Sequence, residues 1–415
     1  MVKKIKVLQI NNYHYLKGGS ETVYLKTGEL LQRKGHDVIF FSVRDKEILD
    51  TKHSSYFINP VDFKNLPFFK KVLMVKRFFY SKDAANSLEK LILDTKPDIA
   101  HLHIFYGRLS LSILPVLKKH KIPVVMTVHE YRMLCPMYLM LDRKGKICEK
   151  CAKGNYFHCV FKRCNRGKLL DSMGVSFECF FRDLFFPYEK HIDKFIMVSK
   201  FIMKKHIKYK PELEEKSVQI YNFINFDKLT PYHSHENYYL YFGRLSKEKG
   251  IFTLLKAWKN FPELKLKIAG SGNEEANLKR MIKENNLKKI KLIGLKKDKE
   301  LEEIGRKAKF VIVPSEWYEN NPMSVIESLA LGTPIIGANI GGIPELISDG
   351  LTGFLFESKN TSSLIRAIEK AEILDEHKYK EFSKSAHSFA KENFNSEIYY
   401  NKLLEVYNNV NSAKS

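Results

Sequence analysis

Residues 310–327 read FVIVPSEWYENNPMSVIE, an apolar run that is followed by a polar loop and then by a second apolar segment. The run 310–313 is short and rich in β-branched residues, which predicts a buried strand. Asn321 followed by Pro322 is typical of a helix start, with asparagine as the capping residue and proline in the first turn. This stretch therefore predicts a strand, a loop and a helix in succession, which is the repeating unit of an α/β fold.

The same alternation of apolar runs and helical segments fills both halves of the chain. It predicts an α/β protein with two Rossmann-like, doubly wound parallel-sheet domains that face each other across a cleft. The predicted strands are 5–10, 38–43, 99–103, 124–128 and 195–198 in the first half, and 238–242, 264–269, 290–293, 310–313, 334–336 and 353–356 in the second.

Residues 221–237 are polar, contain Pro231 and predict a linker. A chain of 415 residues suits two or three domains of roughly 150 residues each. We expect an N-terminal, acceptor-side domain over 1–225, with a cysteine-containing insert at about 135–179, and a donor-binding domain over 226–392. A closing helix is expected at 393–415, where apolar residues recur at helical spacing.

The chain is strongly basic, with 70 lysines and arginines against 47 acidic residues and a net charge of +23. This surplus favours anionic partners. Lysines and arginines alternate with apolar residues over 68–82, which predicts either contact with an anionic membrane surface or a solvated helix face with a buried stripe. Because neither a secretory signal nor an apolar run of ~18 residues is visible, we expect a cytoplasmic protein with peripheral contact at the inner face of the plasma membrane.

Two glutamates flank the predicted helix start in the sequence. Glu319 lies before it in the loop, and Glu327 lies after it inside the helix. Both carboxylates can face one crevice at the helix N-terminus, which binds anions through its free N–H groups and its dipole. Carboxylates also accept hydrogen bonds from hydroxyls, so the arrangement suits a sugar nucleotide. The alternative is that both glutamates only complement the helix dipole.

Two cations, Arg244 and Lys249, follow the first predicted strand of the second half and can reach the same crevice. Aimed at one diphosphate, they would neutralise a leaving group without a divalent metal, although in a lysine-rich chain they can also be surface charge. Gly18, Gly19 and Gly270 lie where strands pass into helices and allow close approach of a ligand, or serve only as turn residues. The dinucleotide fingerprint and the P-loop pattern are both missing, which disfavours dehydrogenases and P-loop kinases.

Histidines and cysteines complete the candidate set. His129 directly follows the predicted strand 124–128, where an imidazole can hydrogen-bond a sugar hydroxyl, whereas His101 and His103 are interpreted as structural.

All six cysteines fall between 135 and 179. The spacing of Cys148, Cys151, Cys159 and Cys164 is compatible with a structural zinc site, and reduced packing or redox-labile thiols are the alternatives. We expect no metal or other cofactor in catalysis.

Together these stretches resemble glycosyltransferase family 4, the retaining branch with the GT-B fold. The resemblance is carried by 242–250 (FGRLSKEKG), Glu319 with Glu327, 329–334 (LALGTP), 341–345 (GGIPE), 18–21 (GGSE) and 129–131 (HEY). It implies transfer of a hexose-type sugar from a UDP- or GDP-sugar to a hydroxyl of a glycan or a lipid-linked precursor, with retention of the anomeric configuration. The cysteine-containing insert resembles that of bacterial members that act on polysaccharide precursors of the cell envelope.

The resemblance also implies that the C-terminal helix at 393–415 packs back on the N-terminal domain, and it implies roles for individual residues. Glu319 would contact the donor sugar and Glu327 the ribose, Arg244 and Lys249 would hold the diphosphate, the Gly18–Gly19 loop would close over the phosphates, and His129 would touch the transferred sugar. The implied catalytic residues are Glu319, Arg244, Lys249 and His129. The implied donor-binding residues are Gly18, Gly19, Arg244, Lys249, Gly270, Glu319, Asn320, Asn321, Pro322, Met323, Ser324 and Glu327.

Three other functions are compatible with parts of the pattern. A GT-B phosphorylase or a sugar-nucleotide epimerase would use the same fold. A basic nucleic-acid-binding protein is the alternative from another class, prompted by the charge of +23 and the 21 tyrosines. We favour the glycosyltransferase and expect no nucleic-acid partner.

Overall fold

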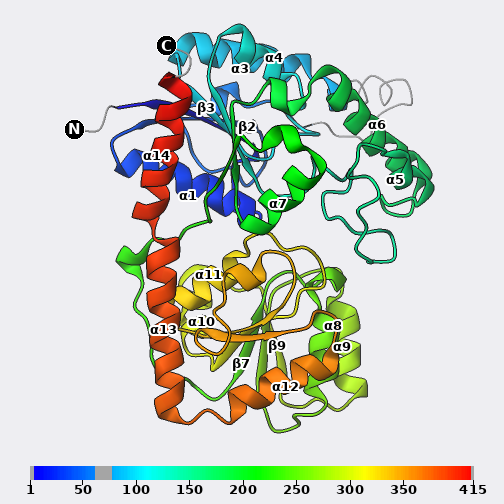
Figure 1. Cartoon of the computed structure of the whole chain (residues 1–415), viewed down its shortest axis with the longest axis vertical. Helices are drawn as coiled ribbons and strands as arrows, with labels where there is room; N and C mark the ends of the chain where they lie inside the picture. The colour runs from blue at the N-terminus through cyan, green and yellow to red at the C-terminus, as the bar shows by residue number, and fades with distance from the viewer. Residues whose placement is uncertain (1–3, 61–76, 413–415) are drawn as a thin grey trace.

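The computed structural model describes residues 4–60 and 77–412, which form two lobes joined by a linker and by the last helices (Figure 1). Each lobe contains a six-stranded sheet in which all neighbouring strands are parallel. The predicted fold class is therefore confirmed. Most of the basic segment 68–82 lies outside the described residues, so the membrane contact predicted for it stays a prediction.

The sheet of the first lobe has the strand order β2-β1-β3-β4-β5-β6. Its strands are β1 (Lys6–Tyr13), β2 (Asp37–Val43), β3 (Ile99–Leu102), β4 (Val124–Val128), β5 (Lys194–Met197) and β6 (Ser217–Gln219). Its helices are α1 (Gly19–Arg33), α3 (Lys82–Thr95), α4 (Ile113–Lys119), α5 (Phe157–Phe161), α6 (Leu169–Phe185) and α7 (Lys200–Tyr209), with 3-10 turns at Ser54–Tyr56, Tyr188–Lys190 and Pro211–Leu213. The sequence prediction missed β6, because its three residues are partly exposed and include a single apolar side chain.

The sheet of the second lobe has the strand order β12-β11-β10-β7-β8-β9. Its strands are β7 (Tyr239–Phe242), β8 (Leu266–Ala269), β9 (Ile290–Gly294), β10 (Phe310–Val313), β11 (Ile335–Ala338) and β12 (Gly353–Phe356). Its helices are α8 (Ile251–Trp258), α9 (Glu275–Glu284), α10 (Asp298–Arg306), α11 (Met323–Ala330), α12 (Thr361–Glu372) and α13 (Glu376–Phe394), with 3-10 turns at Phe226–Lys228, Lys247–Lys249 and Ile343–Glu345. The strand order reverses between β7 and β10, the point at which open α/β sheets bind their ligands.

Parallel sheets of this kind are buried on both faces, because the connecting helices cover them. All four residues of β10 are buried, and Trp258 of α8 packs against the same sheet. The rigid sheets therefore fix the loops that leave their carboxyl ends, and those loops carry most of the predicted site residues.

The last helix, α14 (Ser396–Ser412), returns to the first lobe (Figure 1). Its residues Tyr399, Leu403 and Tyr407 are buried in one cluster with Val7 of β1 and Tyr24 of α1. The helix before it, α13, packs against α11 of the second lobe. The chain thus crosses between the lobes twice, while the domain limits near 225 and 392 stay predictions. None of the helices in the described ranges is long and apolar enough to cross a membrane.

The predicted start of α11 is wrong by one residue, because Pro322 was expected to be the first helical residue. The helix begins at Met323 with Pro322 in the capping position, and no side chain caps it. The side-chain oxygen of Asn321 instead accepts a hydrogen bond from the backbone N–H of Asn222 (2.9 Å), and the Asn222 amide donates to the Asn321 carbonyl (3.0 Å). Asn321 cannot cap the helix because the linker between the lobes occupies its side chain.

Candidate active site

The loops after β7 and β10 lie against each other at the point where the strand order reverses. Gly250, at the end of the first loop, has a φ of 71°, and a Cβ there would lie 1.6 Å from the carbonyl oxygen of Pro314 in the second loop. No larger residue fits without moving one of the backbones. The contact therefore fixes the loop of Arg244 and Lys249 relative to the loop of Glu319.

Glu319 and Lys249 form an ion pair at the centre of this contact. The ammonium nitrogen of Lys249 lies 2.6 Å from Oε1 of Glu319, and the Ser315 hydroxyl donates to the same oxygen at 2.7 Å. The side chain of Glu319 is almost fully buried, whereas that of Lys249 remains partly accessible. A buried carboxylate needs such a partner, because an uncompensated charge in the interior costs several kcal/mol.

Arg244 is exposed, and its guanidinium makes no hydrogen bond or ion pair within the described part of the chain. Tyr241 lies in the same region. Burial raises the pKa of its phenol, the Glu319 and Glu248 carboxylates also raise it, and the charge of Arg244 lowers it. The Tyr241 hydroxyl also donates to the backbone carbonyl of Arg244 (2.7 Å), which holds the loop while the guanidinium remains free for an anionic ligand.

Glu327 lies on α11 and is partly buried without a hydrogen-bond or ion-pair partner among the described residues. Burial raises the pKa of this carboxyl group, and Lys26 on α1 of the first lobe lowers it. Both side-chain oxygens of Glu327 are therefore available as hydrogen-bond acceptors.

The N-termini of α1 and α11 meet at the junction of the lobes. The first helix begins at Gly19, and a Cβ added there would lie 3.8 Å from Cγ of Met323, the first residue of α11. Gly18 precedes it in an extended conformation. Two helix N-termini in contact place their free N–H groups and the positive ends of their dipoles together, which favours an anion. Ser324 follows in the first turn of α11.

His129 is tied to both lobes. Its carbonyl oxygen accepts a hydrogen bond from the side-chain amide of Asn320 at 2.7 Å, and its ring stacks on that of His103. Burial lowers the pKa of His129 to about 3, so the imidazole is neutral at physiological pH. It can therefore act only as a neutral hydrogen-bonding group.

A row of hydrogen-bonded side chains determines which ring nitrogen of His129 carries the proton. Nε2 of His103 donates to Oε1 of Gln9 (3.0 Å), so Nδ1 of His103 accepts from Nε2 of His129 (2.9 Å). The amide nitrogen of Gln9 in turn donates to Nδ1 of His101 (3.4 Å). The same nitrogen of His101 also forms a hydrogen bond with the Tyr407 hydroxyl of α14 (2.7 Å). This leaves Nδ1 of His129 as an acceptor. The two histidines interpreted as structural thus orient the candidate site residue.

Glu130, the residue after His129, has a shifted pKa. The pKa of Glu130 is raised to about 7, mainly by burial and to a lesser degree by the charge of Glu21, although a hydrogen bond from the Tyr106 hydroxyl and the charge of Arg132 oppose the rise. Glu21 is buried in the first turn of α1. Glu130 and Glu21 thus add two partly or fully buried carboxyl groups on the first-lobe side of the junction.

Two glycine contacts hold the surrounding loops. A Cβ on Gly342 would lie 1.9 Å from the carbonyl oxygen of Asn320, and the Gly342 N–H donates to the Glu319 carbonyl at 2.7 Å. A Cβ on Gly270 would lie 1.9 Å from the carbonyl oxygen of Gly243. Gly270 thus packs the β8 loop against the β7 loop, and its predicted contact with the donor stays a prediction.

Several residues that bridge the lobes were not singled out as site residues. The Glu345 carboxylate accepts hydrogen bonds from the backbone N–H groups of Lys200 (2.8 Å) and Phe201 (2.5 Å) at the start of α7. Glu149 of the insert accepts from Lys205 (2.7 Å) and Tyr318 (2.8 Å). Burial alone would raise the pKa of Glu149, but these hydrogen bonds outweigh it and hold the pKa at about 2. Nothing in the sequence pairs these distant positions.

The predicted zinc site is not found. In residues 4–60 and 77–412, no group of three or more histidine, cysteine, aspartate or glutamate side chains is arranged to hold a metal ion. All six cysteines are free thiols, and Cys151, Cys159 and Cys179 pack in one apolar cluster with Tyr156. The spacing of Cys148, Cys151, Cys159 and Cys164 suggested four ligands, but Cys151 and Cys159 are buried in this cluster and Cys164 packs against it. Cys148 lies outside the cluster, and its sulfur accepts a hydrogen bond from the Lys162 ammonium (3.4 Å).

Comparison with known proteins identifies the family. The model of "Glycosyltransferase Family 4" matches residues 17–228, and that of "Glycosyl transferases group 1" matches residues 225–389. Because the first match covers half of the chain, the protein belongs to glycosyltransferase family 4.

Two curated relatives and one solved structure illustrate the likeness. An uncharacterized glycosyltransferase of Methanocaldococcus jannaschii is 32% identical over 43% of this chain, which spans 50% of that protein. An uncharacterized 42.6 kDa protein in the cps region of Klebsiella pneumoniae is 24% identical over 80% of this chain and 84% of its own. The Anabaena protein HepE, solved in complex with UDP-glucose, is 16% identical, with a TM-score of 0.68 over 98% of this chain and 100% of its own. The two lobes have the GT-B arrangement of glycosyltransferases.

Proposed function

We propose that this glycosyltransferase transfers a hexose-type sugar from a UDP- or GDP-sugar to a hydroxyl group, with retention of the anomeric configuration. The supporting observation is the Glu319–Lys249 pair beside two helix N-termini, at the point where the strand order of the second sheet reverses. Carboxylates for sugar hydroxyls and positive groups for a diphosphate are the two requirements of a nucleotide-sugar site.

The donor would lie with its diphosphate between Arg244, Lys249 and the ends of α1 and α11. Arg244 has no competing partner among the described side chains, so it can bind a phosphate without first losing an ion pair. Glu327 would accept hydrogen bonds from the ribose hydroxyls. Glu319 would accept one from the donor sugar while it keeps Lys249 directed toward the phosphates.

The reaction would be a displacement on one face of the sugar. The bond between the anomeric carbon and the phosphate oxygen breaks, and the bond to the acceptor oxygen forms on the same side, so the configuration is retained. The departing phosphate oxygen is then the nearest base for the proton of the acceptor hydroxyl. Arg244, Lys249 and the helix N-termini stabilise the negative charge that develops on the leaving group, and preorganised charges of this kind usually supply the largest part of catalysis.

His129 would position the transferred sugar. Its neutral ring can accept a hydrogen bond from a sugar hydroxyl through Nδ1 and would not repel the positive charge that develops at the anomeric carbon. The acceptor would enter from the first lobe, past Glu130 and Glu21. The proposed acceptor is a glycan or a lipid-linked precursor, and a lipid-linked acceptor would hold the enzyme at the inner face of the plasma membrane.

Product analysis tests this proposal. Purified protein is incubated with a panel of UDP- and GDP-hexoses and a hydroxyl acceptor, with and without EDTA, and the product is examined by proton NMR. We expect one donor to be consumed in both conditions, with the anomeric coupling constant of the donor preserved in the product. Donor turnover that requires inorganic phosphate or no acceptor would indicate a phosphorylase or an epimerase instead.

A further inference from the structure

Helix α6 (Leu169–Phe185) buries polar side chains and exposes apolar ones, the reverse of an ordinary amphipathic surface helix. Its buried residues are Ser172, Ser176, Glu178, Cys179 and Arg182, four of which are polar or charged. Its exposed residues include large apolar side chains: Leu169, Leu170, Phe177, Leu184 and Phe185, with Leu170 78% and Leu184 73% exposed. A surface helix normally buries its apolar stripe and exposes its polar one.

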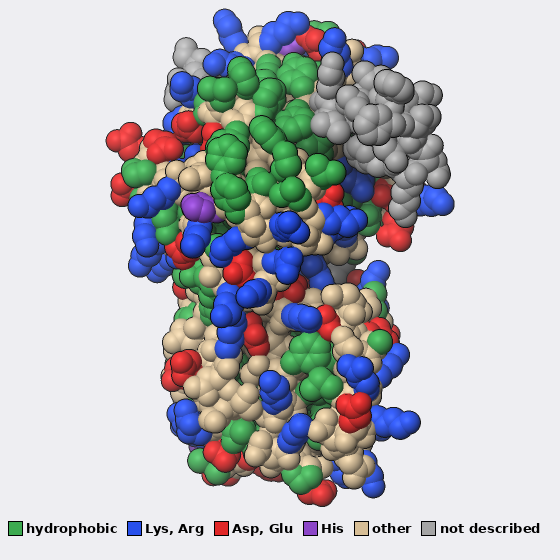
Figure 2. Space-filling view, turned by 90° about the vertical axis from the view of Figure 1, so that its right-hand side faces the viewer, with side chains coloured by type: hydrophobic (Ala, Val, Ile, Leu, Met, Phe, Trp, Pro, Cys, Tyr) green, Lys and Arg blue, Asp and Glu red, His purple; other side chains and the backbone are tan. Residues whose placement is uncertain are grey.

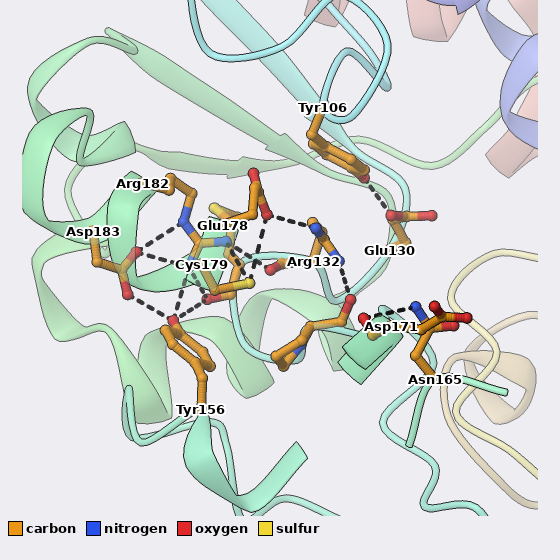
Figure 3. A network of polar contacts seen from close by, with 12 residues as sticks. Tyr106, Glu130, Arg132, Tyr156, Asn165, Asp171, Glu178, Cys179, Arg182 and Asp183 are labelled. Carbon is orange, nitrogen blue, oxygen red and sulfur yellow. Dashed lines mark hydrogen bonds and ion pairs between the residues drawn. The ribbon is translucent and has the colours of Figure 1, made fainter. Parts of the chain in front are cut away.

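Buried ion pairs and hydrogen bonds hold the helix in this orientation (Figure 3). Arg182 donates to the carbonyl oxygens of Arg132 (2.9 Å) and Met133 (3.3 Å), and Arg132 pairs with the almost fully buried Glu178. Rotating α6 to bury its apolar face would expose or unpair these charges, and an unpaired charge in the protein interior is strongly destabilising. The apolar stripe is therefore directed outward by the fold itself.

The stripe is part of a larger apolar surface. Phe157 and Phe161 of the neighbouring helix α5 are also exposed, Phe161 by 79%. Figure 2, which shows the side of the molecule where α5 and α6 lie, displays hydrophobic side chains gathered over the first lobe. Soluble monomers rarely expose contiguous apolar patches of this kind, and such patches usually mark protein or membrane contacts.

A basic cavity borders this surface. It is open to solvent, has a volume of about 630 Å³, and is lined by Asp142, Arg143, Lys144, Lys146, Phe161, Lys162 and Arg163. Five of these residues are cationic and one is acidic, and Lys162 lies 3.3 Å from Asp142. Phe161 belongs to both the cavity and the apolar surface. No predicted donor-site residue lines the cavity, so the glycosyltransferase site does not account for it.

We propose that the exposed faces of α5 and α6, with the adjoining cavity, are the surface by which the protein docks on an anionic lipid bilayer. The apolar side chains would enter the boundary between headgroups and acyl chains, and the cavity would hold a phosphate-bearing headgroup. Apolar residues beside lysines and arginines are the composition that binds anionic interfaces. A second copy of the chain is the less favourable occupant, because two molecules of net charge +23 repel each other. The inference rests on the proposed peripheral membrane location and is independent of the proposed sugar-transfer chemistry.

Vesicle binding tests the docking surface. The full chain is sedimented with vesicles of phosphatidylcholine that contain 30% or no phosphatidylglycerol. We expect binding only to the anionic vesicles, and at least tenfold weaker binding for the triple variant Leu170→Ser/Phe177→Ser/Leu184→Ser. The matched control is Leu49→Ser/Leu93→Ser/Leu295→Ser, which changes three exposed leucines elsewhere and should bind like the wild type.

A second variant separates the cavity from the apolar surface. Arg143→Glu/Lys146→Glu should also lose at least tenfold in binding to the anionic vesicles. Equal binding of the triple variant and the wild type would overturn the proposal, as would a dimer in sedimentation equilibrium that the triple variant dissociates. Binding of UDP, measured by calorimetry in the same variants, should be unchanged. Wild-type protein that binds vesicles but not UDP would refute the proposed donor site and leave this inference intact.

Discussion

Replacing Lys249 with methionine removes the ammonium from the Glu319 ion pair while it keeps most of the side-chain volume. Glu319 is 7% exposed and Lys249 25%, at a separation of 2.6 Å, and the Ser315 hydroxyl is the other partner of the carboxylate. Breaking a fully buried pair costs about 3–5 kcal/mol. Because water reaches Lys249 in part, we expect a loss of about 2–3 kcal/mol in the free energy of unfolding, measured in urea.

The same substitution should abolish most of the activity. One preorganised positive group at a developing anion contributes about 3–4 kcal/mol, which corresponds to a loss of roughly 100- to 1,000-fold in kcat. The control Lys309→Met breaks a pair of similar length with Glu372 (2.7 Å) in the same lobe. It should lower stability and leave kcat within about threefold of the wild type at a temperature where both are folded.

The double variant Lys249→Met/Glu319→Gln distinguishes the two roles of the lysine. Neutralising both partners removes the uncompensated charge, so most of the lost stability should return, whereas the diphosphate still lacks its cation and the activity should stay low. Recovery of both stability and activity would refute the reasoning, because Lys249 would then only compensate the Glu319 charge.

Three further predictions concern the neighbouring groups. Because burial raises the pKa of Glu130 to about 7, the folded chain binds more protons than the unfolded chain from pH about 4.5 to about 7, and the free energy of unfolding should fall as the pH rises through this window. Glu130→Gln should flatten that fall in urea titrations. Glu327→Gln should weaken UDP binding about tenfold in calorimetry, since it exchanges a charge-assisted hydrogen bond to the ribose (about 1.5–3 kcal/mol) for a neutral one (about 0.5–1.5 kcal/mol), a difference of roughly 1–1.5 kcal/mol, with kcat at saturating donor little changed. Tyr407→Phe should change the nitrogen chemical shifts of His129 and lower kcat about fivefold, whereas Tyr399→Phe, which removes an equally buried hydroxyl bonded to Thr27 (3.0 Å), should do neither.

Local patterns were sufficient to predict the two sheets. The strand β10 is a run of four buried apolar residues, and such runs have few alternatives to a parallel strand when helical segments flank them. The β6 strand was missed because a three-residue edge strand has too little apolar content to differ from a loop. Glu319, Lys249 and Arg244 could be placed near one another because parallel strands present their carboxyl ends at one edge of a sheet.

Contacts that depend on side-chain direction were beyond sequence reasoning. The spacing of the cysteines gives the length of chain between thiols but not where each thiol points, so it could not decide between a zinc site and reduced packing, and Cys151 and Cys159 are packing residues. Helical periodicity likewise shows that α6 has an apolar face but not that this face is exposed, which Arg132 and Glu178 decide. The row from His129 to Tyr407 joins four separate segments that no local pattern connects.

A crystal structure of the protein soaked with UDP tests the central claim most directly. The account predicts density for the diphosphate between the guanidinium of Arg244, the ammonium of Lys249 and the first turns of α1 and α11, with the ribose hydroxyls on Glu327. Diphosphate density away from all four of these groups, for example in the basic cavity around Arg143, would contradict it.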